Sequence, residues 1–337
     1  MSSLCPILLL VLVAACAAPT TAVRPLPAPA GPTSQPTTRA PGARTLAKDL
    51  RLTVLESYRV LSGGYEEAYL DGLAHDPELT LLGIGPADVT VGFSPDASVL
   101  VRIFASGEFQ LVSKSLDVRL SRDLTVGWIR DELSYRMTHR GLIVSIPLRM
   151  TAVYERRDDR WILAQQHVSY GLAEELLFAP RKDGRATWRP LALAGVTDKT
   201  SELALRPLVE GIIRYDSPAD IRARVDDAAF VVGILPGRTW SGGSAAEGMS
   251  PRAQLGLDLA TRPVDLRIQL SRTGTVAWAV ADLVVEGVRG DRAVELNVRA
   301  SWVLEHQGEV WKIVQGHLQV PVSREEIAQA VFGASRE

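Results

Sequence analysis

The chain repeats itself at a spacing of 150 residues, and this repeat limits its possible folds more than any other feature. Residues 116–167 align with residues 266–317 without a gap, and fifteen of these 52 positions are identical, where chance would give about three. The identical residues, each matched 150 positions later, are Leu116, Leu120, Ser121, Arg122, Thr125, Val126, Trp128, Leu133, Val144, Arg149, Val153, Glu155, Trp161, Gln165 and His167. The same structural unit is therefore expected twice.

Each unit reads as helices followed by an antiparallel meander. Apolar residues recur three or four apart near the start of both units, as on one face of a helix: Leu46, Leu50, Val54, Tyr58 and Leu61, then Leu205, Leu208, Val209 and Ile212. Strands are expected in the first unit near 109–120, 124–136, 142–156 and 160–170. Capping patterns predict further helix starts at Ser94-Pro95, Ser217-Pro218, Ser250-Pro251 and Ser323 with Glu326. Helices before a meander predict the α+β class.

A helix–helix–strand–helix–sheet unit that ends in the strand pattern W-x-x-x-Q-x-H resembles the SnoaL-like family of the nuclear transport factor 2 and ketosteroid isomerase superfamily. The resembling segments are VGWIRDEL and IPLRMTAVYERRDDRWILAQQHVSY, with their partners VAWAVADL and LNVRASWVLEHQGEVWKIVQGHLQV. The resemblance implies two tandem cone-shaped domains, 45–180 and 199–337, joined by a linker at 181–198. Each would have N-terminal helices packed on a curved antiparallel sheet. Family members usually pair through their sheets, so the resemblance also implies a fused pseudo-dimer with intramolecular domain pairing.

The first residues resemble a bacterial lipoprotein signal. PILLLVLVAAC is an apolar run too short to span a bilayer, and Val13-Ala14-Ala15-Cys16 matches the lipobox with Cys16 as the lipidated residue. We therefore expect a signal peptide at 1–15, then a lipidated cysteine and a Pro/Ala/Thr-rich tether at 16–44. An ordinary secretory signal that happens to contain a cysteine is the alternative.

A lipid anchor implies a membrane partner and a place in the cell envelope. Because Ala17 rather than Asp follows Cys16, the resemblance to Gram-negative lipoproteins implies the outer membrane, with the folded part facing the periplasm. Cys5 and Cys16 are the only cysteines. Cleavage before Cys16 would leave the folded part without a disulfide, a thiol nucleophile or a thiolate metal site.

Strand alternation sorts the repeated residues by face. It places Trp161, Leu163, Gln165 and His167 together, and it sets Arg149 on the polar side of a strand whose other face is apolar, from Ile146 to Tyr154. Possible pocket-lining residues are Trp128, Gln165, His167, Trp278, Gln315 and His317. A second polar set is predicted to be structural or interfacial, with Arg149 paired to Glu132 or Glu155: Glu132, Arg149, Glu155, Asp282, Arg299 and Glu305. The functional alternative assembles a His, an Arg and a carboxylate in each pocket.

Composition and motifs exclude functions rather than name one. The net charge of −2 without a basic block argues against a nucleic-acid partner. One repeated His per unit is too few for zinc, and no cofactor or nucleophile motif is present, so no metal, cofactor or catalytic residue is predicted. The Asp/Tyr set of ketosteroid isomerase is not reproduced either, because Tyr58 has no tyrosine counterpart in the second unit.

Two functional hypotheses remain. The first is a lipid-anchored, non-enzymatic envelope module that binds a small apolar molecule or scaffolds another envelope protein. The second is an isomerase, cyclase or hydrolase of a small apolar substrate, with a His/carboxylate pair in one or both pockets. A catalytic set often survives in only one copy of a duplicated domain, whereas these residues recur in both, which favours the first hypothesis.

Overall fold

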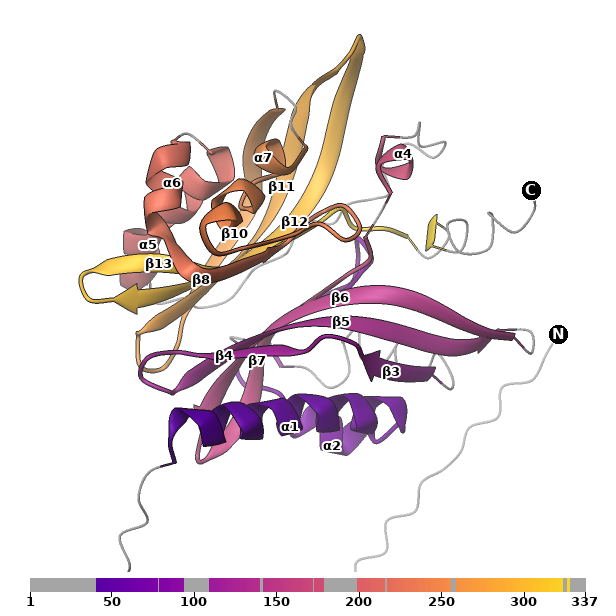
Figure 1. The fold of residues 1–337 in the computed structure, drawn as a ribbon, viewed down its shortest axis with the longest axis vertical. Helices are drawn as coiled ribbons and strands as arrows, with labels where there is room; N and C mark the ends of the chain where they lie inside the picture. Colours follow the sequence, from indigo (N-terminus) through magenta and orange to yellow (C-terminus); the bar gives the residue numbers. More distant parts are fainter. Residues whose placement is uncertain are drawn as a thin grey trace, which may run out of the picture. The chain divides into compact units, whose positions relative to one another are not determined.

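Two sheets, one from each half of the chain, organise the computed structural model (Figure 1). The structure describes residues 41–77, 79–93, 109–139, 142–171, 173–178, 199–215, 217–255, 259–323 and 326–327. We call the described residues up to 178 half 1 and those from 199 onward half 2. Within these ranges, no helix has the length and apolar character needed to cross a membrane.

Half 1 begins with α1 (Ala43–Ser62) and α2 (Glu66–Leu70) and ends with the short helix α4 (Glu174–Leu177). The predicted apolar stripe of α1 is buried, and α1 lies along one face of the sheet (Figure 1). The strands are β1 (Thr80–Leu82), β2 (Val89–Val91), β3 (Phe109–Ser113), β4 (Asp117–Leu120), β5 (Val126–His139), β6 (Leu142–Arg157) and β7 (Arg160–Ser169). Their order is β2-β1-β7-β6-β5-β3, with β4 also paired to β5, and only β1 and β7 run parallel.

Half 2 repeats this arrangement. Helices α5 (Lys199–Arg214) and α6 (Pro218–Arg224) come first, and a 3₁₀ helix, η1 (Gly242–Gly248), and α7 (Pro251–Leu255) follow the first two strands. The strands are β8 (Val225–Val232), β9 (Thr239–Ser241), β10 (Leu259–Leu270), β11 (Val276–Arg289), β12 (Arg292–Gln307) and β13 (Val310–Gln319). Their order is β10-β11-β12-β13-β8-β9, which is the order of half 1 with β10 in place of β3 and β4. The predicted α+β duplication is confirmed.

The serine caps expected in half 2 are formed. The Ser217 hydroxyl accepts a hydrogen bond from the Asp220 amide at 3.3 Å, and the Ser250 hydroxyl accepts one from the Ala253 amide at 3.2 Å. Ser323 and Glu326 exchange two hydrogen bonds, of 2.7 and 3.1 Å, as a capping box does. The helix predicted to start at Ser94 lies outside the described residues.

Three large apolar clusters and a small one, formed by Leu82 and Val280, stabilise the fold. One lies between the helices and sheet of half 1 and includes Met150, Ala152 and Tyr154, so the face predicted to be core is core. The second fills the same place in half 2. The third joins the two sheets on the faces opposite their helices, and its members are Val126, Trp128, Val153, Ala164, Phe230, Val276, Trp278, Val303 and Val314. We call this sheet-to-sheet contact the seam. Because its side chains are almost fully buried, it ties both halves into one compact unit.

A β-bulge in the last strand of each half changes which residues face the seam. The pairing of β6 with β7 shifts between Val153 and Tyr154, so Val153 pairs with Gln165 and Tyr154 with Leu163, which leaves Ala164 as the extra residue. The pairing of β12 with β13 shifts at the equivalent place, around Val314. An extra residue reverses the alternation of side chains along a strand.

Candidate functional site

The shared face predicted for the last strand is therefore wrong. Trp161 and Leu163 belong to the core cluster of half 1. Gln165 and His167, beyond the bulge, pair with Val153 and Thr151 on the seam face. Half 2 behaves in the same way at its own bulge. The extra residue, rather than the alternation of the sequence, decides on which side the glutamines and histidines lie.

The repeated histidines meet at the centre of the seam. The rings of His167 and His317 stack with their centroids 3.9 Å apart and an angle of 19° between their planes. His167 Nδ1 is hydrogen-bonded to the Ser301 hydroxyl at 2.9 Å, and His317 Nδ1 to the Thr151 hydroxyl at the same distance. His317 Nε2 also contacts the Ser169 hydroxyl at 2.7 Å, whereas His167 Nε2 has no partner among the described residues.

Because of this environment, neither histidine lines a pocket. Both are completely buried, and burial lowers the pKa of each well below its usual range. The nearby positive charge lowers both pKa values further: Arg299 and Arg149 act on His167, and Arg149 acts on His317 together with the neighbouring His167. Their hydrogen-bond partners are hydroxyl groups, and no carboxylate in the described residues bonds to either ring. The His/carboxylate pair of the enzyme hypothesis is not formed.

The repeated arginines tie each half to a turn of the other. The Arg149 guanidinium donates to the carbonyl oxygens of Gly233, Ile234 and Leu235 at 2.6, 3.4 and 2.9 Å. Arg299 donates to the equivalent turn of half 1, at the carbonyl oxygens of Gly85 (3.3 Å) and Pro86 (3.2 Å). The arginines thus bind backbone carbonyls across the seam in a reciprocal pattern.

The two arginines differ in their charge partners. Arg299 forms an ion pair of 3.1 Å with Asp282, and both side chains are fully buried. Glu132, the counterpart of Asp282, is exposed, and the structure describes no ion pair between it and Arg149. Burial therefore lowers the pKa of Arg149 to about 10, although the charge of Glu132 opposes this shift. The expected pairing of Arg149 with Glu132 or Glu155 is wrong, because the guanidinium reaches the other half instead.

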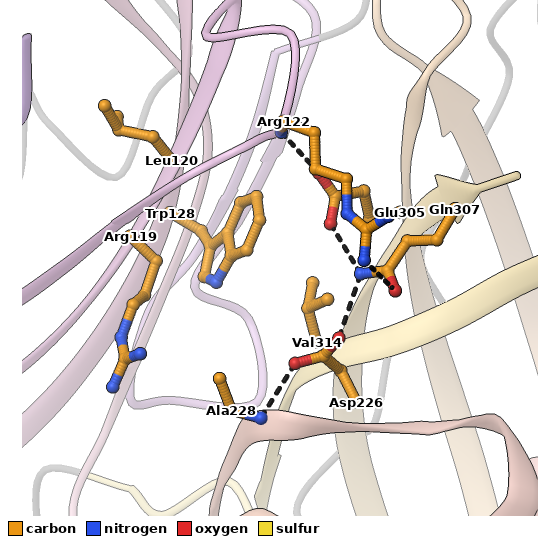
Figure 2. A pocket seen from close by; sticks show the side chains of 9 residues that line it. All are labelled: Arg119, Leu120, Arg122, Trp128, Asp226, Ala228, Glu305, Gln307 and Val314. Atoms are coloured by element: carbon orange, nitrogen blue, oxygen red, sulfur yellow. Dashed lines mark hydrogen bonds between the residues drawn. The ribbon is translucent and has the colours of Figure 1, made fainter. Parts of the chain in front are cut away.

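The remaining repeated residues also lie at the seam. Glu155 accepts a hydrogen bond from the Arg272 amide at 2.9 Å, and Glu305 accepts one from the Arg122 amide at 2.7 Å, so each acid holds a hairpin turn of the opposite half. Gln165, Trp278 and Gln315 are buried there too. Of the residues predicted to line a pocket, Trp128 alone is among those that line the cavity between the halves shown in Figure 2.

A polar group that sequence reasoning missed lies inside half 1. Asp131 is on β5, on the face that carries Ile129 and Leu133 into the core, and its side chain is fully buried. Its Oδ1 accepts a hydrogen bond from the Ser115 amide at 3.1 Å, whereas its Oδ2 has no hydrogen-bond partner among the described residues. Burial raises the pKa of Asp131, although weaker polar contacts with the Ser113 and Tyr58 side chains and hydrogen bonding to the backbone oppose this rise.

Tyr58 completes this site. Burial raises the pKa of its hydroxyl well above the usual range, and the negative charge of Asp131 raises it further. The hydroxyl makes a weak contact of 3.9 Å with the Met150 sulfur. Tyr58 and Ser113, the two side chains next to Asp131, also line a groove of about 440 Å³ between α1 and β3. The carboxyl group thus lies directly behind the wall of a groove.

Half 2 lacks this polar centre. Ala281 occupies the position of Asp131, Leu304 that of Tyr154, and α5 offers only Leu208 and Val209 near the position of Tyr58. The signal that could have revealed the site is therefore a difference between the repeats. An acid lies on an otherwise apolar face in one copy, and an alanine occupies the equivalent position in the other. Asp131 is not among the identical positions of the repeat, so those positions do not reveal it.

Comparisons with known proteins agree with the duplicated architecture. The model of the SnoaL-like domain family matches residues 67–173 and again residues 213–323, more than half of the chain. No curated protein matches the chain.

Solved structures each resemble only part of the chain. A calcium/calmodulin-dependent protein kinase II association domain, described as putative, from Xanthomonas campestris has 23% identity and a TM-score of 0.32, over 41% of this chain and 94% of its own. A dehydratase of the NTF2-like family, also described as putative, from Streptomyces avermitilis has 17% identity and a TM-score of 0.34, over 39% of this chain and 100% of its own. Likenesses this weak do not bear on activity. On the strength of the family match, the chain belongs to the SnoaL-like domain family and carries two copies of the domain in tandem.

Proposed function

We propose that this protein is a lipid-anchored binding protein of the cell envelope, and that half 1 holds its ligand site. The ligand would be a small, mainly apolar molecule with one oxygen-containing group. Half 2, with its apolar interior, would serve as the structural partner that braces half 1 through the seam. The scaffolding of another envelope protein, the other form of this hypothesis, has no comparable support from the described residues.

The unpartnered Oδ2 of Asp131 is the observation that carries this proposal. A buried polar atom without a hydrogen bond costs on the order of 1–3 kcal/mol, so it is kept where a ligand or function compensates for it. Asp131 lies behind Tyr58 and Ser113, which line the groove. Ligand sites combine mostly apolar walls with a few such polar groups. A hydroxyl group could donate to the carboxylate, or the protonated acid could donate to a carbonyl group.

Binding can be tested with 2-naphthol as a fluorescent probe and naphthalene as its counterpart without oxygen. We expect Asp131→Ala, which installs the residue of half 2, to weaken 2-naphthol binding at least tenfold and to leave naphthalene binding unchanged. Glu132→Ala is the matched control, because it removes the next acid on the same strand, which is exposed. Equal 2-naphthol affinity in the wild type and the Asp131 variant would contradict the proposal, as would an equal loss in the control.

A second candidate function, acid–base catalysis on a small apolar substrate, has one observation in its favour. A carboxyl group with a raised pKa next to a tyrosine occurs in half 1 but has no counterpart in half 2, which is the asymmetry expected of a catalytic set. The reaction would transfer a proton next to a carbonyl group. Exchange of the α-protons of 2-tetralone in D₂O, followed by NMR, tests it: catalysis that Asp131→Asn abolishes would support an enzyme, and no exchange above background would leave binding alone.

The lipid anchor rests on Cys16 and its lipobox, which lie outside the described residues. Labelling of bacterial cells with an alkyne analogue of palmitate should mark the wild type but not Cys16→Ser. Cys5→Ser is the control, because Cys5 belongs to the predicted signal peptide and should be removed with it. Density-gradient separation of the two membranes would then test the outer-membrane location, and label that persists in Cys16→Ser would refute the anchor.

A further inference from the structure

A cavity of about 270 Å³ lies between the two halves beside the seam, distinct from the groove of half 1. It lies between β4 and β5 of half 1 and β8, β12 and β13 of half 2. We call it the seam cavity, and its lining residues are Arg119, Leu120, Arg122, Trp128, Asp226, Ala228, Glu305, Gln307 and Val314 (Figure 2). Because the halves are related by the repeat, the counterparts of these residues, 150 positions away, form a counterpart site, and a comparison of the two shows what the cavity lacks.

At the counterpart site, a guanidinium group neutralises two acids. Arg157 donates to Asp76 at 2.6 Å and to Glu155 at 2.5 Å. In the seam cavity the equivalent acids are Asp226 and Glu305, and the residue between them is the neutral Gln307. Its side-chain amide donates to Asp226 at 2.9 Å and to Glu305 at 2.7 Å. Within the described residues, neither acid forms an ion pair, although the Arg122 guanidinium, which also lines the cavity, donates to the Gln307 side-chain carbonyl at 2.9 Å. Asp226 and Glu305 therefore lack the direct guanidinium contact that Arg157 gives their counterparts.

The indole group of Trp128 shows a second difference. Its counterpart Trp278 donates a hydrogen bond of 2.7 Å to the side-chain carbonyl of Gln269. Arg119 takes the place of Gln269 in the seam cavity, and it brings only donors, of which Nε is paired with Asp117 at 3.2 Å. No described residue accepts a hydrogen bond from the Trp128 indole, which is 5% exposed, and its nitrogen points into the space near Ala228 and Asp226 (Figure 2).

We propose that the seam cavity binds a small zwitterion with a guanidinium or ammonium group at one end and a carboxylate at the other, such as a free basic amino acid. The cation would lie against Asp226 and Glu305, where the counterpart site holds the Arg157 guanidinium. The carboxylate would accept from the Trp128 indole and from Arg119. Charge-assisted hydrogen bonds of this kind, in a partly dehydrated cavity, provide both affinity and orientation.

Three probes distinguish the contributions of the two charged groups of the ligand, and calorimetry on the purified protein measures the binding of each probe. L-Arginine carries both charged groups, agmatine lacks the carboxylate, and L-citrulline has a neutral urea in place of the guanidinium. We expect L-arginine to bind about tenfold more tightly than either analogue, since each analogue loses one charged contact. No binding of L-arginine at millimolar concentration, or equal binding of all three probes, would overturn the proposal.

Two variants assign the contacts. Gln307→Arg recreates the ion pairs of the counterpart site, so it should abolish binding of L-arginine while it leaves the protein folded and at least as stable. Trp128→Phe keeps the aromatic ring but removes the N–H donor, and it should weaken L-arginine about fivefold without affecting agmatine. Trp278→Phe is its matched control outside the cavity and should leave L-arginine affinity unchanged. Undiminished binding by Gln307→Arg would overturn the site. Asp131→Ala should leave L-arginine affinity unchanged, which keeps this test separate from the test of the half 1 groove.

Discussion

The stacked histidines at the seam predict a strong loss of stability in mild acid. His167 and His317 are buried and stacked on each other, their hydrogen-bond partners among the described residues are hydroxyl groups, and Arg149 and Arg299 are nearby. Protonation would place two positive charges 3.9 Å apart, measured between ring centroids, without a carboxylate bonded to either ring. Uptake of the first proton would oppose uptake of the second, so the folded pair stays neutral.

The size of the effect follows from linkage. An unfolded histidine has a pKa of about 6.5, and a folded pKa below that value means that only the unfolded chain binds protons as the pH falls. Stability is therefore complete above about pH 6.5 and declines below it by about 1.4 kcal/mol per pH unit for each histidine. From pH 7 to pH 5 the two residues together should cost about 4 kcal/mol, a large part of the stability of a typical domain.

Urea denaturation at several pH values, followed by tryptophan fluorescence, measures this decline. We expect His167→Gln combined with His317→Gln to lower stability at pH 7 but to remove about 4 kcal/mol of the loss between pH 7 and pH 5. His306→Gln is the control, because it removes an exposed histidine that lies outside the stacked pair. Carboxyl groups titrate equally in all variants and cancel. If the double variant loses stability as steeply as the wild type, the reasoning is refuted.

Further predictions concern the charged residues, each measured by urea denaturation. Arg299→Met should cost about 3–5 kcal/mol and more than Arg149→Met, because it leaves Asp282 buried without its ion pair; adding Asp282→Leu should restore most of the loss. Asp131→Ala should raise stability by about 1 kcal/mol at pH 7 and by less at pH 4, since a raised folded pKa destabilises the fold as the pH rises through it. Burial opposes ionisation of Asp123, but hydrogen bonds from Ser121, Thr275 and Thr125 hold its pKa at about 2. Asp123→Asn should therefore cost on the order of 1 kcal/mol at pH 7, after allowance for solvent screening, and the difference should vanish as the pH falls from 4 to 2.

Much of the architecture could be predicted because the repeat and the apolar periodicity depend on residues that are close together in the sequence. The stripe of α1 and the apolar face of β6 each follow the period of their element, and both proved to be core. The duplicated sheet order follows from the same spacing. These features depend on residues close together in the chain, where a single sequence is informative.

The features that could not be predicted depend on an inserted strand residue and on distant contacts, neither of which leaves a pattern in the nearby sequence. The bulge at Ala164 adds one residue between two well-formed ladders, and no turn or proline announces it, so the alternation rule failed for His167. The carbonyl partners of Arg149 belong to a turn 84 to 86 residues away. A guanidinium that binds backbone carbonyls leaves no complementary acid in the sequence, which is why an acidic partner was expected instead.

The differences between the two copies have a physical explanation that links both proposed sites. A seam residue such as His167 or Arg149 contacts the other half, so a change in one copy disturbs a contact of the other. Asp131 lies inside one half, where no such reciprocal contact restrains it, and it differs from Ala281. Gln307 and Arg119 line the seam cavity and differ from Arg157 and Gln269, and there Asp226 and Glu305 lack a guanidinium partner among the described residues. Identity between the copies thus accompanies contacts that hold the two halves together, whereas their differences coincide with the two proposed ligand sites.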